Sequence, residues 1–585
     1  MAKRKNRVPT PAKAPKNKWL RSLASKFEQS NRILIISLIT IAVLFALQLT
    51  VFTSSYQTND DIGMTFLASG KGTSPSPNEH LRYSHVIFGM LLKFLYGVTD
   101  AVPWYGLYHF VVHFFAMAAL LYAVLSSEKS LKRYLFFILY FLSIEVFFLT
   151  NLQFTVTACI AAQSAVILYI TALNEDRKRL WFLYLASMIF FIIGCMVRSS
   201  GSLLILLLGL PIISHLAWKN RKNRSRIIQM AIFWAVLIVT VTGLKSFERN
   251  YYNNDPAWSD FFEFNSMKSR IIDFDHISYT RENQHIFKEV GWSQNDFYTF
   301  RSWFYADEEL FSTENVRKIV EQFPARKSNV SIAVIMSGFA NVFSKGWLFI
   351  IVAAYFLLFV KGGRGHRRAI LSTLVLIVVM MAWLIYAKRL PARVFQPMLS
   401  YFAVLCLYFG DMHLRHLSKS RKILHRVFLL FFAVAIFYGA TLMYGESVSA
   451  REHSESFRAT IDTLAPKKDQ LFIVWGASLP YVDILPFDTM DFMENFNLIS
   501  LGTTLRTPVT KARMKEFGID NIYRAPYEKK NIYFIVRNNK YLFLYTQFVK
   551  EHYDVDIKFR YIFTSDDFNV AQVGIQDSNN TIEVK

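Results

Sequence analysis

Cysteine and acidic residues are both scarce in this chain. The three cysteines, Cys159, Cys195 and Cys406, all fall inside apolar runs, which excludes a disulfide framework and a Cys-x-x-Cys metal site. Acidic residues number 43 against 66 Lys and Arg, so the net charge is +23. A basic chain can bind nucleic acid, but 53% hydrophobic and 16% aromatic residues in a length of 585 are too many for soluble domains. We therefore expect a lipid bilayer as its partner and no nucleic acid.

Apolar windows long enough to cross a membrane recur from residue 33 to residue 445. A helix of about 20 residues crosses the hydrocarbon core of a bilayer. The sequence therefore predicts an α-helical polytopic membrane protein whose transmembrane domain is 33–445. We expect about eleven spans, at 33–53, 103–125, 131–150, 152–173, 180–197, 200–217, 226–245, 343–360, 368–387, 393–411 and 426–444.

Basic residues indicate how the chain is oriented. Residues 1–32 carry ten Lys or Arg and a single acid directly before the first span, without a clear cleavage site. This pattern indicates a retained signal anchor with a cytoplasmic N-terminus. Five basic loops then fall on the cytoplasmic side, and the loops 54–102 and 246–330 fall outside. This topology requires residues 83–98 to lie on the outer surface as an amphipathic helix, and a short, tilted span is the alternative.

The tail, residues 446–585, changes to charged segments punctuated by Pro and Gly. In it "LFIVWG", "NIYFIV" and "YLFLYTQFV" predict strands, and "TPVTKARMKEFG" predicts a helix that Thr507 or Thr510 caps and Gly518 ends. We expect a small soluble α/β domain on the extracytoplasmic side. The chain as a whole is then a multi-pass protein of the plasma (inner) membrane.

The stretch "SSYQTNDDIGM" places two adjacent carboxylates, Asp60 and Asp61, just after the first span. An isolated pair of this kind is most simply a solvated turn. The same outer loop also carries Glu79, Arg82 and His85 beside the predicted surface helix, and we expect these three to contact substrate. An Asp at a water–lipid boundary can act as a general base on a hydroxyl. We therefore expect a reaction site here, and little effect of either carboxylate on stability.

The arrangement resembles the GT-C class of integral-membrane glycosyltransferases. Its first span ends in an acidic pair, an outer loop with a surface helix follows, and "NDDIGMTFLASGKG" is similar to the acidic motif of that class. The resemblance implies transfer of a sugar from a polyprenyl-phosphate donor to a glycan or polysaccharide acceptor of the cell envelope. It implies Asp60 as general base and Asp61 as a supporting acceptor or metal ligand. The class often has Asp-Glu here, so which Asp is the base stays open, as does a divalent Mg²⁺ or Mn²⁺ ion held by both.

A lipid-phosphate leaving group develops negative charge at the headgroup level, and a cation must meet it there. The turn "AKRLPAR" places Lys388, Arg389 and Arg393 on the expected outer side, where the positive-inside preference gives no reason for them. Arg198, between two apolar runs, is a further candidate. We expect these four residues to bind the donor phosphate. The alternative is that they anchor helix ends by snorkelling.

Two other functions stay open. A flippase or transporter of lipid-linked oligosaccharides would explain the spans, but it needs polar residues near the bilayer midplane, where Glu145 is the main one. A glycan polymerase or ligase would differ mainly in the size of its donor and acceptor. The polar residues that collect in the expected outer loops favour a transferase.

Overall fold

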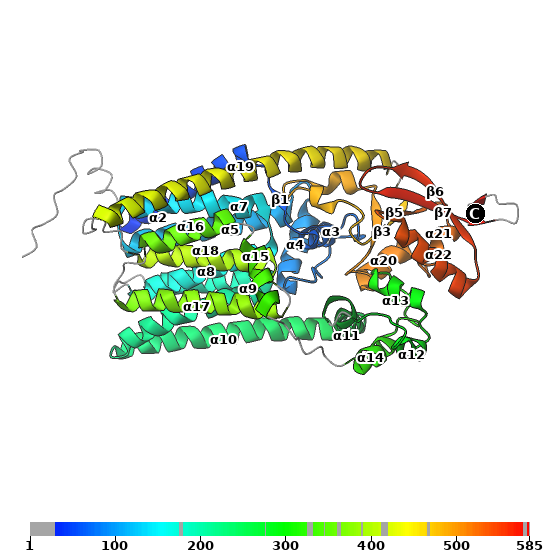
Figure 1. Cartoon of the computed structure of the whole chain (residues 1–585), viewed down its shortest axis with the longest axis horizontal. Helices are drawn as coiled ribbons and strands as arrows, with labels where there is room; N and C mark the ends of the chain where they lie inside the picture. The colour runs from blue at the N-terminus through cyan, green and yellow to red at the C-terminus, as the bar shows by residue number, and fades with distance from the viewer. Residues whose placement is uncertain are drawn as a thin grey trace, which may run out of the picture.

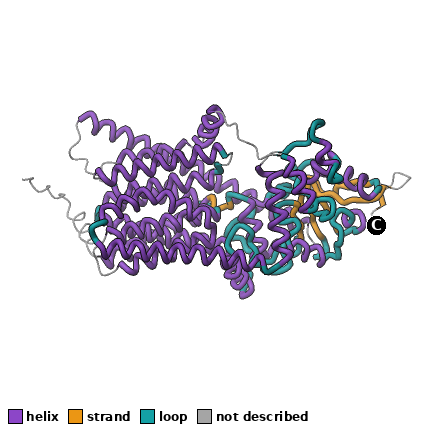
Figure 2. Tube along the Cα trace, turned by 90° about the horizontal axis from the view of Figure 1, so that it is seen from below, coloured by secondary structure: helices purple, strands orange, loops and turns teal. Residues whose placement is uncertain are grey.

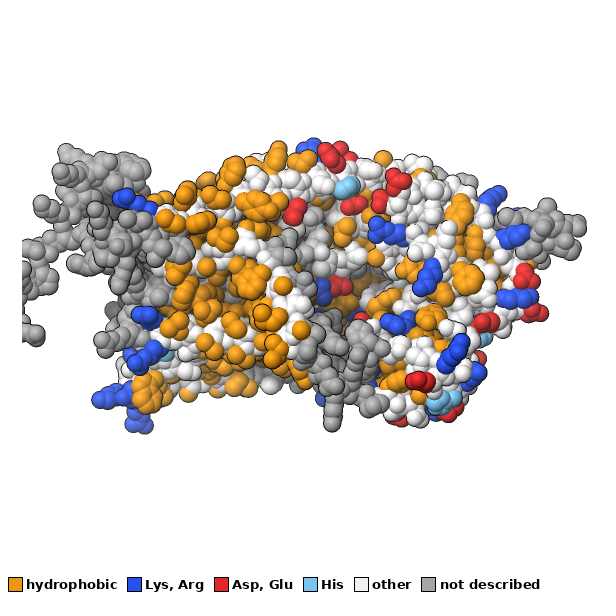
Figure 3. All heavy atoms as spheres, in the orientation of Figure 1, with side chains coloured by type: hydrophobic (Ala, Val, Ile, Leu, Met, Phe, Trp, Pro, Cys, Tyr) orange, Lys and Arg blue, Asp and Glu red, His pale blue; other side chains and the backbone are white. Residues whose placement is uncertain are grey.

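The computed structural model describes residues 30–174, 180–274, 277–323, 332–343, 346–359, 364–387, 390–410, 419–464, 468–576 and 582–583. Long helices form a bundle at one end of an elongated molecule, and a β-sheet with short helices forms the other end (Figures 1 and 2). Hydrophobic side chains cover the visible face of the bundle, while Lys, Arg, Asp and Glu are frequent on the sheet end (Figure 3). This division is typical of a bundle in lipid with a domain in water.

Nine helices of the described ranges are long and apolar enough to cross a membrane. One of them is the continuous run Leu131–Thr150, in which a π-helical turn joins two α-helices. The nine are α2 (Ser30–Val51), α5 (Trp104–Ser127), α6 (Leu131–Tyr140) with η1 (Phe141–Glu145) and α7 (Val146–Thr150), α8 (Phe154–Asn174), α9 (Leu180–Asn220), α10 (Arg224–Asn253), α17 (Arg364–Tyr386), α18 (Ala392–Phe409) and α19 (Lys419–Leu464). These helices support a helical membrane protein.

Helix α9 is a hairpin rather than one straight helix. The backbone of Arg198 is extended, with φ −159° and ψ 97°, so the helical hydrogen bonding is interrupted there. Gly194 and Ser202 lie on either side of this break, and both pack against the backbone of Ala158 in α8. Eight residues of a straight helix rise about 12 Å, so the two could not share one neighbour unless the chain doubled back. The hairpin thus contains the expected spans 180–197 and 200–217.

Two further apolar helices are too short for the usual thickness of a membrane. α16 (Gly346–Phe359) has 14 residues and covers part of the expected span 343–360. α4 (Val86–Val98) has 13 residues, or about 20 Å, which fits the expected surface helix at 83–98 better than a crossing. α15 (Ile332–Phe343) adds 12 residues beside α17. The number of crossings therefore depends on α16.

The segment after α2 leads directly to the candidate site. β1 (Ser55–Tyr56) pairs in parallel with β2 (Asn151–Leu152), which ties the end of α2 to the start of α8. α3 (Asn59–Ser69) begins three residues after β1 and ends at Gly70, whose φ of 72° is left-handed. An added Cβ at this glycine would lie 2.3 Å from the backbone nitrogen of Pro77, so only glycine fits the turn.

The expected outer loop 246–330 is mostly helical. It contains the end of α10 and then α11 (Pro256–Ser269), η2 (Arg270–Phe274), α12 (Gln284–Lys288), α13 (Gln294–Arg301) and α14 (Thr313–Gln322). Asp255 caps α11 and Ser293 caps α13 through side-chain hydrogen bonds. Aromatic residues of these helices share a hydrophobic core with the C-terminal sheet. This region therefore belongs with the sheet end of the molecule.

The tail contains a mixed six-stranded sheet in the order β4-β3-β5-β7-β6, with β8 paired to β7. β3 pairs in parallel with β4 and β5, and the remaining pairs are antiparallel. Its strands and helices are β3 (Leu471–Trp475), η4 (Tyr481–Asp483), η5 (Met490–Met493), β4 (Asn497–Leu501), α20 (Pro508–Glu516), α21 (Ala525–Glu528), β5 (Ile532–Val536), α22 (Asn539–Tyr553), β6 (Ile557–Thr564), β7 (Asn569–Gln576) and β8 (Ile582–Glu583). The described part of the tail thus contains both helices and a sheet.

Most of the predicted tail elements form, and one is wrong. The strands "LFIVWG" and "NIYFIV" are β3 and β5, and the predicted helix is α20, capped by Thr507 and followed by Gly518 with φ 59°. The predicted strand "YLFLYTQFV" lies inside α22 instead. Asn538 caps that helix, and the buried residues Leu542, Tyr545 and Val549 recur at helical spacing.

The central strand β3 of the sheet is buried on both faces. Alternate residues of β3 point to opposite sides: Leu471 and Ile473 join the core with the helices of 256–323, while Phe472 and Val474 join the core continuous with the bundle. α19 runs unbroken for 46 residues, so the expected domain boundary at 446 lies inside a helix. At 1.5 Å per residue it is about 69 Å long and links the bundle to the sheet (Figure 1).

Candidate functional site

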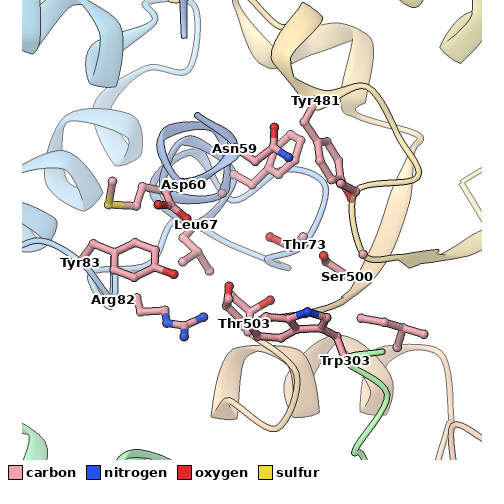
Figure 4. Close-up of a pocket in the computed structure, with 18 of the residues that line it drawn as sticks. Asn59, Asp60, Leu67, Thr73, Arg82, Tyr83, Trp303, Tyr481, Ser500 and Thr503 are labelled. Atoms are coloured by element: carbon pink, nitrogen blue, oxygen red, sulfur yellow. The ribbon is translucent and has the colours of Figure 1, made fainter. Parts of the chain in front are cut away.

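A cavity of ≈ 310 Å³ lies between α3 and the loops of the C-terminal sheet (Figure 4). We call it the Asp60 cavity. Three segments that are far apart in the sequence form it, and the aromatic residues that line it are Phe66, Tyr83, Trp303 and Tyr481. The polar side chains that line it are Asn59, Asp60, Thr73, Arg82, Ser500, Thr503 and Thr504. A small cavity with aromatic walls and several convergent polar groups is typical of a binding site for a small polar molecule.

Asp60 lies in the first turn of α3 and lines the cavity. An aspartate is stabilised there by the positive end of the helix dipole. Its carboxylate accepts a hydrogen bond of 3.1 Å from Arg393, in the first turn of α18. Both side chains keep part of their surface exposed, 29% for Asp60 and 25% for Arg393. The expected phosphate ligand Arg393 thus contacts the expected base, and orients it.

Asp61 has a different environment from its neighbour. It is fully buried, and its oxygens accept hydrogen bonds from the hydroxyls of Thr58 (2.9 Å) and Tyr105 (3.1 Å) and from the backbone N–H of Phe154 (2.9 Å). Burial raises the pKa of the Asp61 carboxyl to about 7, although these three hydrogen bonds act to lower it. Asp61 therefore joins α3 to α5 and α8 through buried hydrogen bonds.

These contacts bear on the expected metal. A divalent ion held by Asp60 and Asp61 would need free oxygens on both side chains. Asp61 uses both of its oxygens for internal donors and does not line the cavity, whereas Asp60 faces Arg393. The pair does not fit a shared Mg²⁺ or Mn²⁺ site, because only one of the two carboxylates is accessible.

Strained backbone gathers around the cavity. In the described part of the chain four non-glycine residues have left-handed φ: Arg82 (65°), Trp303 (71°), Arg506 (75°) and Asp554 (51°). Arg82 and Trp303 line the Asp60 cavity. Arg506 lies two residues after Thr504, which also lines it. Such conformations cost about 1 to 3 kcal/mol each and persist where the surrounding structure enforces them, often at functional sites. Three of four near one cavity is an independent indication that it is functional.

A second cavity, of ≈ 610 Å³, adjoins the first and shares Arg82 and Tyr83 with it. We call it the basic cavity, because four cations line it together with one acid, Glu248. It lies between the residues before α4, the turn of the α9 hairpin and the end of α10. The four cations are Arg82, Arg198, Lys245 and Arg249. Their combined charge suits an anionic group such as a phosphate.

The basic cavity lies where the apolar part of α10 ends. The exposed side chains of this helix are apolar from Ile227 to Val239, and Lys245 and Arg249 follow one and two turns beyond Val241. The whole helix of 30 residues is about 45 Å long, more than a bilayer core of about 30 Å needs. Lys245 and Arg249 therefore lie just beyond the apolar part of α10.

Two of the cations that the sequence singled out have defined contacts. The guanidinium of Arg198 donates to the backbone carbonyl of Tyr83 (3.0 Å) and lies 5.7 Å from the centre of the Tyr83 ring. Arg82 donates weakly to Asn265 (3.4 Å), and its Nη1 is buried with no hydrogen-bond partner among the described residues. A buried guanidinium N–H without an acceptor is costly, so this atom indicates a missing anionic or polar ligand.

Glu79 and His85 have mainly structural contacts. Glu79 pairs with Lys93 (2.7 Å) and accepts a hydrogen bond from Tyr251 (2.9 Å), which joins α4 to α10. His85 caps α4 with Nδ1 and donates from Nε2 to the carbonyl of Leu244 (2.8 Å). Both ring nitrogens are therefore in use, although His85 lines the basic cavity. We expect neither side chain to exchange protons with a substrate.

The expected ligands Lys388 and Arg389 lie outside the described residues. The sequence interpretation missed Lys245 and Arg249, although a signal for both was available. Lys245 and Arg249 follow an apolar span on the expected outer side, where the positive-inside preference gives no reason for basic residues. The same argument identified the cations of "AKRLPAR". Trp303 is one of the aromatic residues of the loop 246–330 that, from the sequence, could stack on a sugar or equally dip into the membrane interface, and it was not assigned to the site.

No protein-family model matches this chain, and no curated protein matches it. The site must therefore be interpreted from its own geometry.

Proposed function

We propose that the chain is a membrane glycosyltransferase of GT-C type, which transfers a sugar from a polyprenyl-phosphate donor to a cell-envelope glycan or polysaccharide. One observation carries the proposal: the carboxylate of Asp60 lines a cavity that shares Arg82 and Tyr83 with a basic cavity at the end of an apolar helix. A candidate base and a candidate phosphate site are thus neighbours. They adjoin where a lipid donor and a water-soluble acceptor would meet.

The donor lipid would lie along α10, whose exposed side chains are apolar. Its phosphate would then reach Lys245, Arg249, Arg198 and the unpaired Nη1 of Arg82 in the basic cavity. Guanidinium groups suit this task because their parallel N–H donors match phosphate oxygens. The sugar would point across Arg82 and Tyr83 into the Asp60 cavity.

The chemistry follows from these positions. Asp60 takes the proton of the acceptor hydroxyl as the hydroxyl oxygen bonds to the anomeric carbon. The bond between that carbon and the phosphate oxygen breaks on the opposite side, so the configuration inverts and the electron pair leaves with the lipid phosphate. The cations of the basic cavity stabilise the charge that develops there. Arg393 holds Asp60 in position, and no step runs through a metal ion.

The same proposal assigns the sides of the membrane. The N-terminus is cytoplasmic, and the C-terminal domain is extracytoplasmic in the plasma (inner) membrane. Support comes from the five basic loops on one side and from the position of the segments 54–102 and 446–585. In Figure 1, α3 and α4 of the first segment lie at the same end of the bundle as the sheet of the second.

A reconstituted assay tests the proposal. The purified chain in nanodiscs is given short polyprenyl-phosphate sugars with different head sugars and a cell-envelope polysaccharide, and released polyprenyl phosphate is measured. We expect Asp60→Asn to reduce release by about 10² to 10⁴-fold, the usual contribution of a general base. Asp260→Asn, an exposed carboxylate of α11, is the matched control and should keep the wild-type rate.

Two outcomes contradict the proposal at different points. If the folded wild-type protein releases polyprenyl phosphate from none of the donors, the chain is not this kind of transferase. If Asp60→Asn keeps the wild-type rate, transfer occurs but Asp60 is not its base.

A transporter of lipid-linked sugars is the second candidate, and one contact favours it. Within the apolar helices His113 Nδ1 lies 2.6 Å from Glu145 Oε1, and both side chains are fully buried. Ionisable pairs at such depth often belong to proton or ion pathways. Without an acceptor, a transporter would move a fluorescent polyprenyl-phosphate sugar between liposome leaflets, and Glu145→Gln would stop it. We expect no such movement from a transferase.

A further inference from the structure

Trp303 occupies a backbone position that usually belongs to glycine. α13 ends at Arg301, and Trp303 follows with φ 71°. Its N–H bonds to the carbonyl of Phe300 (3.0 Å), and the N–H of Phe304 bonds to the carbonyl of Thr299 (3.1 Å). This pair of hydrogen bonds is the Schellman helix end, whose left-handed residue is most often Gly. Tryptophan strains the backbone there, so its side chain has another role.

The C-terminal sheet holds this strained turn from both sides. The indole N–H of Trp475, in β3, donates to the carbonyl of Ser302 (2.7 Å). The hydroxyl of Tyr523 donates to the carbonyl of Phe304 (3.0 Å). Because these two carbonyls flank Trp303, its backbone cannot relax without breaking contacts to the sheet domain. The tertiary structure therefore sets the direction of the indole ring.

The indole ring of Trp303 is a wall of the Asp60 cavity, close to Thr503 and facing the side from which Asp60 enters (Figure 4). The ammonium nitrogen of the buried Lys268 lies 4.6 Å from the centre of this ring. When Lys268 is protonated, this cation–π contact helps to hold the ring in place. Burial, with the charge of Arg82 nearby, lowers the pKa of Lys268 to about 7. The ring is thus a rigid apolar surface inside an otherwise polar cavity.

We propose that Trp303 is the platform on which a pyranose ring of the acceptor stacks, while Asn59, Ser500 and Thr503 bind its hydroxyls. The inference rests on the proposed function and adds that the acceptor group is a cyclic sugar, not an open polyol or a protein side chain. The C–H face of a pyranose is apolar and packs on an aromatic ring, whereas its rim of hydroxyls needs hydrogen bonds. The cavity supplies both surfaces.

Binding can be measured without any transfer. Saturation-transfer NMR on the full chain in nanodiscs uses methyl β-D-glucopyranoside, methyl β-D-galactopyranoside and methyl N-acetyl-β-D-glucosaminide as probes, with ribitol as the open-chain comparison. We expect ring-proton signals from at least one pyranoside and none from ribitol. Trp303→Gly, which removes the ring and suits the left-handed backbone, should weaken binding at least tenfold while the protein stays folded. Trp303→Phe should weaken it less.

Asp554→Gly is the matched control. It removes the same kind of left-handed residue, with φ 51°, at the end of α22 and away from the cavity. We expect it to bind pyranosides as the wild type does. Unchanged pyranoside binding by Trp303→Gly would overturn the inference, as would equal binding of ribitol or no binding of any probe. Binding that depends on Trp303 in a protein that transfers no sugar would leave the inference standing and refute only the proposed function.

Discussion

Replacing the buried carboxylate Asp61 tests the reasoning about the site most directly. Asp61→Ala removes the acceptor of the Tyr105 hydroxyl and of the Phe154 backbone N–H, both of which are buried. Asp61→Asn keeps an oxygen at the position that accepts both of these hydrogen bonds. Its new amide group would face Thr58, whose hydroxyl can turn to accept instead of donate. The two variants therefore separate the hydrogen bonds from the charge.

The loss of folding stability follows from the number of buried donors that are left without an acceptor. Each buried donor that loses its acceptor costs about 1 to 3 kcal/mol, so two donors put Asp61→Ala at about 2 to 6 kcal/mol. Asp61→Asn should cost about 1 kcal/mol or less, because both donors keep an acceptor. Since these bonds fix α3 against α5 and α8, Asp61→Ala should also displace Asp60 and reduce activity.

The pH dependence has a definite sign. Burial raises the pKa of Asp61 to about 7, from its ordinary value of 3.8, so the folded state binds a proton between these values that the unfolded state has lost. The stabilisation from this group is fully present below about pH 4 and is lost as the pH rises through about 7. Asp61→Asn lacks this titration. The wild type should therefore become more stable relative to Asp61→Asn as the pH falls from 8 to 5.

Thermal melting in detergent, followed by tryptophan fluorescence at pH 5 to 8, measures both effects. The reasoning is refuted if Asp61→Ala melts like the wild type, or if Asp61→Asn is equally damaging. A melting difference between wild type and Asp61→Asn that does not change with pH would refute the titration alone.

Three further predictions concern the donor site, the hairpin and the topology. The double change Lys245→Ala, Arg249→Ala should raise the KM for a polyprenyl-phosphate donor about ten- to a hundredfold and leave the KM for the acceptor unchanged, which steady-state kinetics will check. Gly194→Val should prevent the α9 hairpin, because an added Cβ would lie 2.9 Å from a backbone carbonyl oxygen, whereas Gly243→Ala on α10 meets nothing within 4 Å; the yield of monodisperse protein compares them. Cysteines placed at the exposed position 294 and at position 500, but not at 222, should react with an impermeant reagent added outside, and labelling at 222 would contradict the orientation.

Much of the architecture could be predicted because its causes are local. Apolar runs of membrane length specified the long helices, and the 16-residue run 83–98 contains the short apolar helix α4. Thr507 and Gly518 marked the ends of α20 through capping chemistry that involves only near neighbours. The prediction failed at "YLFLYTQFV", where a short aromatic run fits a strand as well as a helix. There the cap at Asn538 and the burial of one helical face decided.

The site could be predicted only in outline. The sequence drew attention to Asp60 and Asp61, but neighbours on a helix differ by about 100° in direction, so one can face a cavity while the other is buried. Tyr105 and Phe154, from two other helices, decide which is which. Arg393 is 333 residues from Asp60 in the chain, and their ion pair has no local signature.

By itself the sequence determined the long apolar helices, which loops are basic and which short stretch carries an acidic pair, because hydrophobic spacing and capping act between residues a few positions apart. Only the tertiary structure decided that α9 turns back at Arg198, that Lys245 and Arg249 join Arg82 around one cavity, and that Trp303 walls another. Those arrangements arise from packing between distant segments. Each side chain takes its role from neighbours that no stretch of sequence contains.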